Sequence, residues 1–282
     1  MTTRSPGREL LRHLVSSPLS ITGLIILGVV FAGACLAPLI APYDPDLIDA
    51  AARLAPPSLA HWGGTDEVGR DIFSRILWGA HASLGVGLGV VAIGAGAGTL
   101  IGCFSGLAGG WIDALIMRIM DIVMALPGLV VALALAAALG PSLINAMIAI
   151  GVLGIPGYGR VARGLALGIR KRNFVQAART FGAGRWHVLV RHVIPNVFSS
   201  MLVLATLDVG NAMLGVATLS FIGLGARPPL AEWGAMVNAG QPYILGQWWY
   251  ALLPGLAILM TALAFNLIGD AIGPLVDPRR EK

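Results

Sequence analysis

Charged side chains are scarce in this sequence. Asp, Glu, Lys and Arg make up only 12% of its 282 residues, whereas soluble domains carry about 25%. Hydrophobic residues make up 56%. This composition excludes an ordinary soluble domain and indicates an all-α polytopic membrane protein.

Lysine and cysteine are also nearly absent. Lys171 lies between two arginines and Lys282 ends the sequence, so neither has the glycine context of a phosphate-binding loop. The chain therefore cannot bind ATP in that way, and energy has to come from a partner chain or an ion gradient. Cys35 and Cys103 lie inside apolar runs without ligand spacing, which excludes a disulfide framework and a cysteine metal site.

Six apolar stretches are long enough to cross a membrane. The first, residues 21–40, exceeds the roughly 7–15 residues of a signal-peptide core. The other five are expected at residues 83–107, 122–139, 143–160, 197–222 and 251–268. With both termini in the cytoplasm, the chain divides into an N-terminal segment (1–20), the first span (21–40), an extracytoplasmic loop (41–80), a transmembrane core (81–270) and a cytoplasmic tail (271–282).

Two loops have the composition expected outside the cell membrane. Residues 41–80 are acidic and rich in proline, and residues 72–80 have a helical spacing that predicts a surface helix before the second span. The loop over residues 223–250 is rich in Gly, Pro and Trp. Its end, Trp248-Trp249-Tyr250, suits an aromatic belt at the membrane interface.

Positive charge is concentrated in one loop, residues 168–196, and in its approach. This stretch has no Asp or Glu, and its cations are Arg160, Arg163, Arg170, Lys171, Arg172, Arg179, Arg185 and Arg191. Such a segment lies in water on the cytoplasmic side, and this bias explains the basic pI without nucleic-acid binding. We expect two short helices, over 171–180 and 185–193, separated by Gly182-Ala183-Gly184, with Pro195 ending the second.

Glycine forms the clearest periodic pattern. Gly94, Gly98, Gly102 and Gly106 lie four residues apart, so they share one face of the second span. Small residues at that spacing allow close helix packing in a membrane. A stripe that lines a pore is the alternative, and packing is favoured.

Asp208 and Asn211 share one face of the fifth expected span. A charge in mid-span costs at least about 2.5–3.5 kcal/mol on insertion scales, so it faces protein or a water-filled path. The pair either forms an interhelical hydrogen bond or lines a polar translocation route. The sequence leaves both interpretations open.

The sequence contains no complete catalytic or metal-binding motif. Asp208 with Asp270 would suit an intramembrane protease, but Asp270 lacks the first glycine of a GxGD motif, and Ser105 lacks GxSG spacing. His187 and His192 are five residues apart, which does not align two ligands on one helix face. We therefore expect no catalytic centre, metal or other cofactor.

The stretch FVQAARTFGAGRWHVLVRHVIPN, from Phe174, resembles the cytoplasmic EAA loop of ATP-binding cassette (ABC) importer permeases. The motif positions fall on Gln176, Ala177, Ala178, Gly182 and Pro195. Gln176 stands where the family has Glu, which preserves a helical docking shape without the family's charge. By this resemblance, these residues couple the permease to an ATPase.

Further stretches narrow the resemblance. GGTDEVGRDIFSRILWGAHASLGVG, RIMDIVMALPGLV, LSFIGLGARPPLAEWGAMV and PGLAILMTALAFNLIGD resemble the C-type subunit of dipeptide, oligopeptide and nickel permeases. The tail departs from the family, with Ala-Ile-Gly-Pro-Leu-Val before Asp-Pro. The resemblance implies a type I ABC importer permease fold in a bacterial inner membrane.

The resemblance also implies partners: a homologous permease subunit in a heterodimer, two ATP-binding subunits and an extracytoplasmic solute-binding protein, all set in membrane lipid. The cargo is expected to be a dipeptide or oligopeptide. A nickel or glutathione-type importer is the alternative within the group. An ion-coupled secondary transporter is the alternative outside it, although no convincing inverted repeat is visible.

Overall fold

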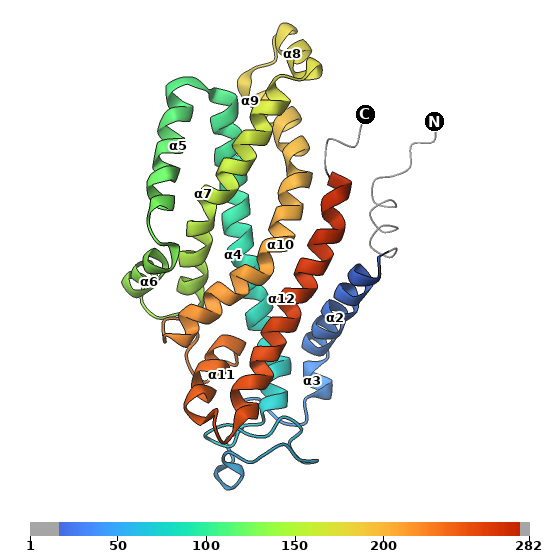
Figure 1. Ribbon diagram of the computed structural model, residues 1–282, viewed down its shortest axis with the longest axis vertical. Coiled ribbons are helices and arrows are strands. Elements are labelled where there is room, and N and C mark those ends of the chain that lie inside the picture. The colour runs from blue at the N-terminus through green and yellow to red at the C-terminus, as the bar shows by residue number, and fades with distance from the viewer. Residues whose placement is uncertain (1–16, 277–282) are drawn as a thin grey trace.

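The computed structural model describes residues 17–276, and in this range the chain is an α-helical bundle without β-strands (Figure 1). This confirms the expected all-α class. The helical elements are α2 (Pro18–Cys35), α3 (Ala37–Ile40), η1 (Ala50–Ala52), α4 (Ile72–Ala108), α5 (Gly110–Ala125), α6 (Gly128–Leu139), α7 (Leu143–Arg170), α8 (Asn173–Thr180), α9 (Arg185–Val188), η2 (Leu189–Val193), α10 (Ile194–Phe221), α11 (Trp233–Gly240), η3 (Gln241–Tyr243) and α12 (Trp248–Val276).

Five helices are long and apolar enough to cross a membrane: α2, α4, α7, the continuous helix through α9, η2 and α10, and α12. A sixth span is formed if α5 and α6 are counted as one broken span. The structure thus agrees with the expected six spans when α5 and α6 are counted together as one broken span. The expected 143–160 span is longer in the structure, since α7 continues to Arg170.

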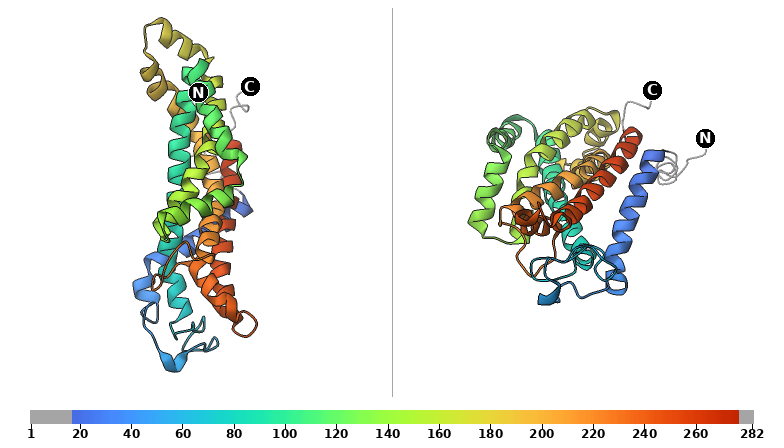
Figure 2. Two further views of the ribbon diagram at one scale, coloured as in Figure 1. Left: turned by 90° about the vertical axis from the view of Figure 1, so that its left-hand side faces the viewer. Right: turned by 60° about the horizontal axis from the view of Figure 1, so that its bottom comes forward.

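The two ends of the bundle differ in chemistry. At one end, here called the basic end, α8 and α9 project beyond the long helices (Figure 1). At the opposite end, here called the loop end, residues 41–71 and α11 are gathered (Figure 2). All cations of residues 168–196 therefore lie at the basic end, and the acidic 41–71 segment lies far from them.

The second expected span is part of a longer helix, α4. Asp71 begins it by accepting hydrogen bonds from Ser74 N (2.8 Å) and Ser74 Oγ (2.7 Å), which is N-capping by a carboxylate. The helix then runs without interruption for 37 residues. The separate surface helix that we expected over 72–80 is wrong, because no breaker follows Ile72, and Ile72 and Ala80 are buried.

The third expected span differs most from the structure. It was expected to begin at residue 122, but α5 already occupies Gly110–Ala125. After Leu126 and Pro127 the chain turns, and α6 makes an angle of 92° with α5. Proline lacks a backbone donor and restricts the residue before it, so the helix ends there.

The glycine stripe of α4 packs against α7, which confirms the packing interpretation. At Gly98, an added Cβ would lie 2.6 Å from Tyr158 Cβ and 2.7 Å from the Ile155 carbonyl oxygen. Gly102 approaches the Gly159 carbonyl and Gly106 the Arg163 carbonyl in the same way. The backbones of the two helices are in contact, so this face of α4 does not line a pore.

The aromatic belt expected at residues 248–250 is only partly present. Trp248 is half exposed, whereas Trp249 and Tyr250 are buried against the 41–71 segment. The Trp249 indole donates to the Thr65 carbonyl oxygen (3.4 Å), and the Tyr250 hydroxyl donates to the Glu67 carboxylate. These two aromatics therefore hold α12 to the loop end instead of meeting lipid.

Candidate functional site

The basic segment, residues 168–196, is anchored by the buried Val175, Val188, Leu189 and Val193, and most of its other side chains are exposed. Val175 of α8 and Val188 of α9 are fully buried, in a cluster that also contains Leu107 of α4 and Ala166 of α7. The opposite side of α8 carries the exposed Ala177. The helix is thus fixed to the bundle on one side and is free to contact another molecule on the other.

The turn after α8 has a backbone conformation that favours glycine. Gly182 has φ of +86°, in the left-handed region that side chains with a Cβ rarely adopt. No atom lies within 4 Å of the position a Cβ would occupy. The turn borders an open concavity of about 450 Å³, lined by Ala178, Phe181, Gly182, Ala183, Gly184 and His187.

Gln176 has a contact that a glutamate could not make. Its Nε2 atom donates a hydrogen bond of 3.1 Å to the carbonyl oxygen of Arg170, the last residue of α7. The carbonyls at the end of a helix lack intrahelical donors. The amide therefore caps α7 and orients α8, whereas an ionised Glu only accepts hydrogen bonds.

Pro195 does not end a helix, which corrects our expectation. The helix from Arg185 continues through η2, a π-helical turn over Leu189–Val193, and on to Phe221. Pro195 is the second residue of α10, but it lies inside this continuous helix, where proline removes one backbone hydrogen bond. The π turn changes the hydrogen-bond pattern just before the proline, and this allows the helix to pass through it.

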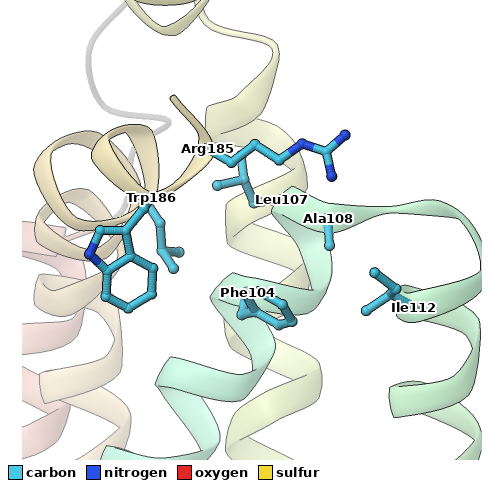
Figure 3. Close-up of a pocket in the computed structure, with 7 residues that line it drawn as sticks. Phe104, Leu107, Ala108, Ile112, Arg185 and Trp186 are labelled. Atoms are coloured by element: carbon cyan, nitrogen blue, oxygen red, sulfur yellow. The ribbon is translucent and has the colours of Figure 1, made fainter. Parts of the chain in front are cut away.

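A groove separates α9 from the basic ends of α4 and α5 (Figure 3). We call it the Trp186 groove. It is lined by Phe104, Leu107, Ala108, Ile112, Arg185, Trp186 and Leu189, and it has a volume of about 230 Å³. In Figure 3 the Arg185 side chain extends above Ala108 and Ile112, while the Trp186 ring turns down beside Phe104. Trp186 is 72% exposed.

Two of the arginines before the basic segment have partners on α5. Arg163 makes two hydrogen bonds with Asp113, at 2.5 and 2.6 Å, and Ser105 donates to the same carboxylate. Arg160 pairs with Asp121 at 2.6 Å, with both side chains about half exposed. These arginines hold α5 against α7, so they are not free loop charges.

Asp208 and Asn211 lie together in a second cavity, of about 380 Å³, among α4, α6, α7 and α10. Tyr158 lines the same cavity and is 5% exposed. Its hydroxyl lies near the Asp208 carboxylate, but it makes no hydrogen bond of acceptable geometry with the described residues. The rest of the lining is apolar or glycine, so polar groups converge there in mid-bundle.

The structure thus gathers the expected site residues into two groups, one on α8 and its turn and one in the Asp208 cavity, and leaves Pro195 apart. Gln176, Ala177, Ala178 and Gly182 lie on α8 and its turn, and Pro195 lies separately at the start of α10. The sequence did not single out Tyr158, which lines the Asp208 cavity, or Trp186 of α9. It also did not show that Asp113 and Asp121 pair with arginines of α7. The signal for Trp186 was available, because a tryptophan among arginines is unusual inside a solvated loop.

Comparison with known proteins agrees with this architecture. Residues 98–282 match the family model described as binding-protein-dependent transport system inner membrane component. Residues 5–57 match the N-terminal transmembrane domain of oligopeptide transport permease C.

Individual relatives match along almost the whole chain. The probable D,D-dipeptide transport system permease protein DdpC of Escherichia coli strain K12 is 54% identical, over 98% of this chain and 93% of that protein. The dipeptide transport system permease protein DppC of Alkalihalophilus pseudofirmus is 41% identical, over 99% and 91%. The glutathione transport system permease protein GsiD of Pectobacterium atrosepticum is 38% identical, over 99% and 93%.

Proposed function

Because the chain belongs to the family of binding-protein-dependent transport system inner membrane components, we propose that it is the membrane permease subunit of an ATP-driven peptide importer. Its helical spans and the names of its dipeptide and glutathione relatives support this reading. Of the relatives named above, the one with the highest identity is described as a D,D-dipeptide permease, which favours small peptides as cargo.

The assembly that we propose contains four further kinds of component. A homologous permease subunit completes the pathway, two ATP-binding subunits supply energy, a solute-binding protein delivers cargo, and lipid surrounds the spans. The absence of a phosphate-binding loop from the sequence supports a separate ATPase. The Asp208 cavity is open and not enclosed, which suits a pathway shared between two subunits.

In this proposal the basic end faces the cytoplasm. Arginine and lysine favour the cytoplasmic side of a membrane, and residues 168–196 carry no carboxylate. The exposed side of α8, the concavity beside Gly182 and the 91% exposed Phe181 form the surface that an ATP-binding subunit would cover. Movement of that subunit then passes into α10, because the helix from Arg185 is continuous.

The Asp208 cavity forms part of the route in this proposal. A carboxylate in mid-membrane is costly unless it meets water, a partner or cargo. The Tyr158 hydroxyl, which lies near the Asp208 carboxylate without a hydrogen bond of acceptable geometry, adds a second polar group. Peptides carry donors and acceptors at both termini, so a cavity with these groups suits them.

The coupling surface is tested by Gly182→Asn in the assembled complex. Asn tolerates the left-handed φ of Gly182, so the turn is kept while a side chain enters the concavity. We expect uptake of peptide and stimulated ATP hydrolysis to fall about tenfold or more, as for losing roughly 1.4 kcal/mol at a contact hot spot. The chain should still insert into the membrane.

Gly110→Asn is the matched control. Gly110 also has a positive φ, of +58°, and open space around a Cβ, but it lies at the α4–α5 turn, outside the concavity. The coupling proposal fails if Gly182→Asn transports normally, or if both variants lose transport equally. The importer proposal itself fails if no ATPase co-purifies and uptake persists without ATP, which is the behaviour of an ion-coupled secondary transporter.

The cargo is identified through the partner binding protein. The proposal expects it to bind dipeptides or oligopeptides, and mass spectrometry of the ligand released from the purified protein tests this. Recovery of a nickel chelate or glutathione would move the chain to the alternative importers of the same group.

A further inference from the structure

The Trp186 groove does not end at the residues in Figure 3. A neighbouring pocket of about 370 Å³ shares Phe104, Trp186 and Leu189 with it and continues between α4, α5 and α10 past Leu100 and Ile116. The lining of that extension is wholly apolar. The two pockets therefore form one long slot that runs from the basic end into the membrane-spanning part of the bundle.

The mouth of this slot is positively charged. Arg185 is the only charged residue in its lining, and its side chain extends over the mouth (Figure 3). Asp113, the carboxylate next to Ile112 in the chain, is already bound by Arg163 and Ser105. No acidic residue occurs in the sequence between Asp121 and Asp208, so the chain offers Arg185 no nearby counter-charge from that stretch.

The exposed Trp186 at the mouth is a side chain suited to a membrane interface. An indole ring has an apolar body and one N–H donor, and tryptophan is enriched where lipid headgroups meet the acyl region. The Trp186 ring is exposed, and it turns from the mouth toward the apolar slot. The guanidinium of Arg185, the indole of Trp186 and the apolar slot therefore follow one another along the groove. This is the order in which a lipid arranges its headgroup, its interfacial region and its acyl chain.

We propose that the Trp186 groove binds one anionic phospholipid, with its phosphate on Arg185 and an acyl chain along Phe104, Leu189 and Ile116. A guanidinium binds phosphate oxygens through two parallel N–H donors, and an anionic headgroup adds the net charge that attracts it. The lipid contacts α4, α5 and α9 at once. It therefore joins the basic segment to the bundle across a gap that protein side chains leave open.

The test uses the full chain in its assembled complex, reconstituted into vesicles. Bromine atoms on a lipid acyl chain quench a tryptophan that they touch. Brominated phosphatidylglycerol and brominated phosphatidylcholine are compared at equal mole fraction, and the Trp186→Phe variant is subtracted to isolate the signal of Trp186. We expect Trp186 to prefer phosphatidylglycerol about fivefold, which corresponds to about 1 kcal/mol for one basic residue near the lipid surface.

Two arginine variants separate a site from general attraction to the membrane. Arg185→Gln should abolish the preference, and Arg185→Lys should keep most of it because the charge remains. Arg191→Gln, on the same continuous helix but outside the groove, should leave the preference unchanged. These substitutions are at exposed side chains, so the fold should be retained.

Two results would overturn the proposal. Equal quenching by both lipids means that Trp186 meets only bulk lipid. No quenching by either lipid means that a protein partner covers the groove in the complex. Neither result depends on ATP-driven uptake, so the lipid site can fail while the importer function stands.

Discussion

The contact between α4 and α7 can be tested with one added methyl group. On one side of α4 the methyl group would collide with α7, and on the other side it would meet open space. At Gly98 an added Cβ would lie 2.6 Å from Tyr158 Cβ and 2.7 Å from the Ile155 carbonyl. Real Cβ atoms essentially never approach within 3.0 Å, and ordinary contact begins at 3.4 Å. The two helices would have to separate by about 0.4–0.8 Å. At Gly96, no atom lies within 4 Å of the added Cβ.

The expected magnitudes follow from two opposing terms. Replacing a helical glycine by alanine stabilises a helix by about 0.8–1.0 kcal/mol. Overpacking of a close contact costs about 1–3 kcal/mol. Gly96→Ala shows only the first term, and Gly98→Ala shows both. The propensity term cancels between the two variants, so Gly98→Ala should be less stable than Gly96→Ala by about 1–3 kcal/mol.

The assay is equilibrium unfolding of the purified chain in mixed micelles of rising denaturing detergent, followed by circular dichroism and tryptophan fluorescence. Both variants have the same composition, so their difference in free energy of unfolding reports the packing at position 98. Equal stability of the two variants would refute close backbone contact between α4 and α7.

Three further predictions concern the two ends of the bundle and its cavity. Gln176→Glu removes the donor to the Arg170 carbonyl, so the free energy of unfolding should fall by about 0.5–1.5 kcal/mol; unchanged stability in the same unfolding assay would show that the cap has no effect. Burial raises the pKa of Glu67 above 4.5. The folded state therefore binds more protons than the unfolded state just above that pH, and stability falls as pH rises through this window. Glu67→Gln should remove this pH dependence and raise stability at neutral pH, and a parallel pH profile for wild type and variant would contradict it. Asp208→Asn should lower peptide uptake at normal protein level while Asp208→Glu keeps part of it; normal uptake by Asp208→Asn would remove the carboxylate from the route.

The sequence predicted those features that depend on local patterns. Glycines spaced four apart define one helix face, and the structure places that face against α7. The first span was also predicted to within five residues, because a long apolar run has a single stable conformation in lipid. The last was predicted less closely, since α12 ends eight residues beyond the expected 251–268.

Other features depend on contacts that are distant in the chain. Nothing near Arg163 in the sequence indicates that Asp113, 50 residues away, is its partner. From the sequence alone, Trp249 and Tyr250 are typical interfacial aromatics. In the structure the 41–71 segment covers them.

Proline was the least reliable guide at the helix ends. Pro127 stops α5 and turns the chain, whereas Pro195 lies inside a continuous helix. The two prolines differ in their surroundings: Pro127 follows the last turn of α5 and begins a new direction, while Pro195 follows a π turn. The backbone path at Pro195 was therefore not predicted, and the roles of the candidate site residues stay predictions.

The helix from Arg185 to Phe221 has a mechanical consequence. At 1.5 Å per residue, Asp208 lies roughly 35 Å from Arg185 along this helix. If the helix tilts as a stiff rod pivoting near Arg185, a rotation of roughly 5° would displace the carboxylate by roughly 3 Å, about the length of one hydrogen bond. A tilt small enough to leave the packing near Arg185 intact would therefore be large enough to make or release a polar contact at Asp208.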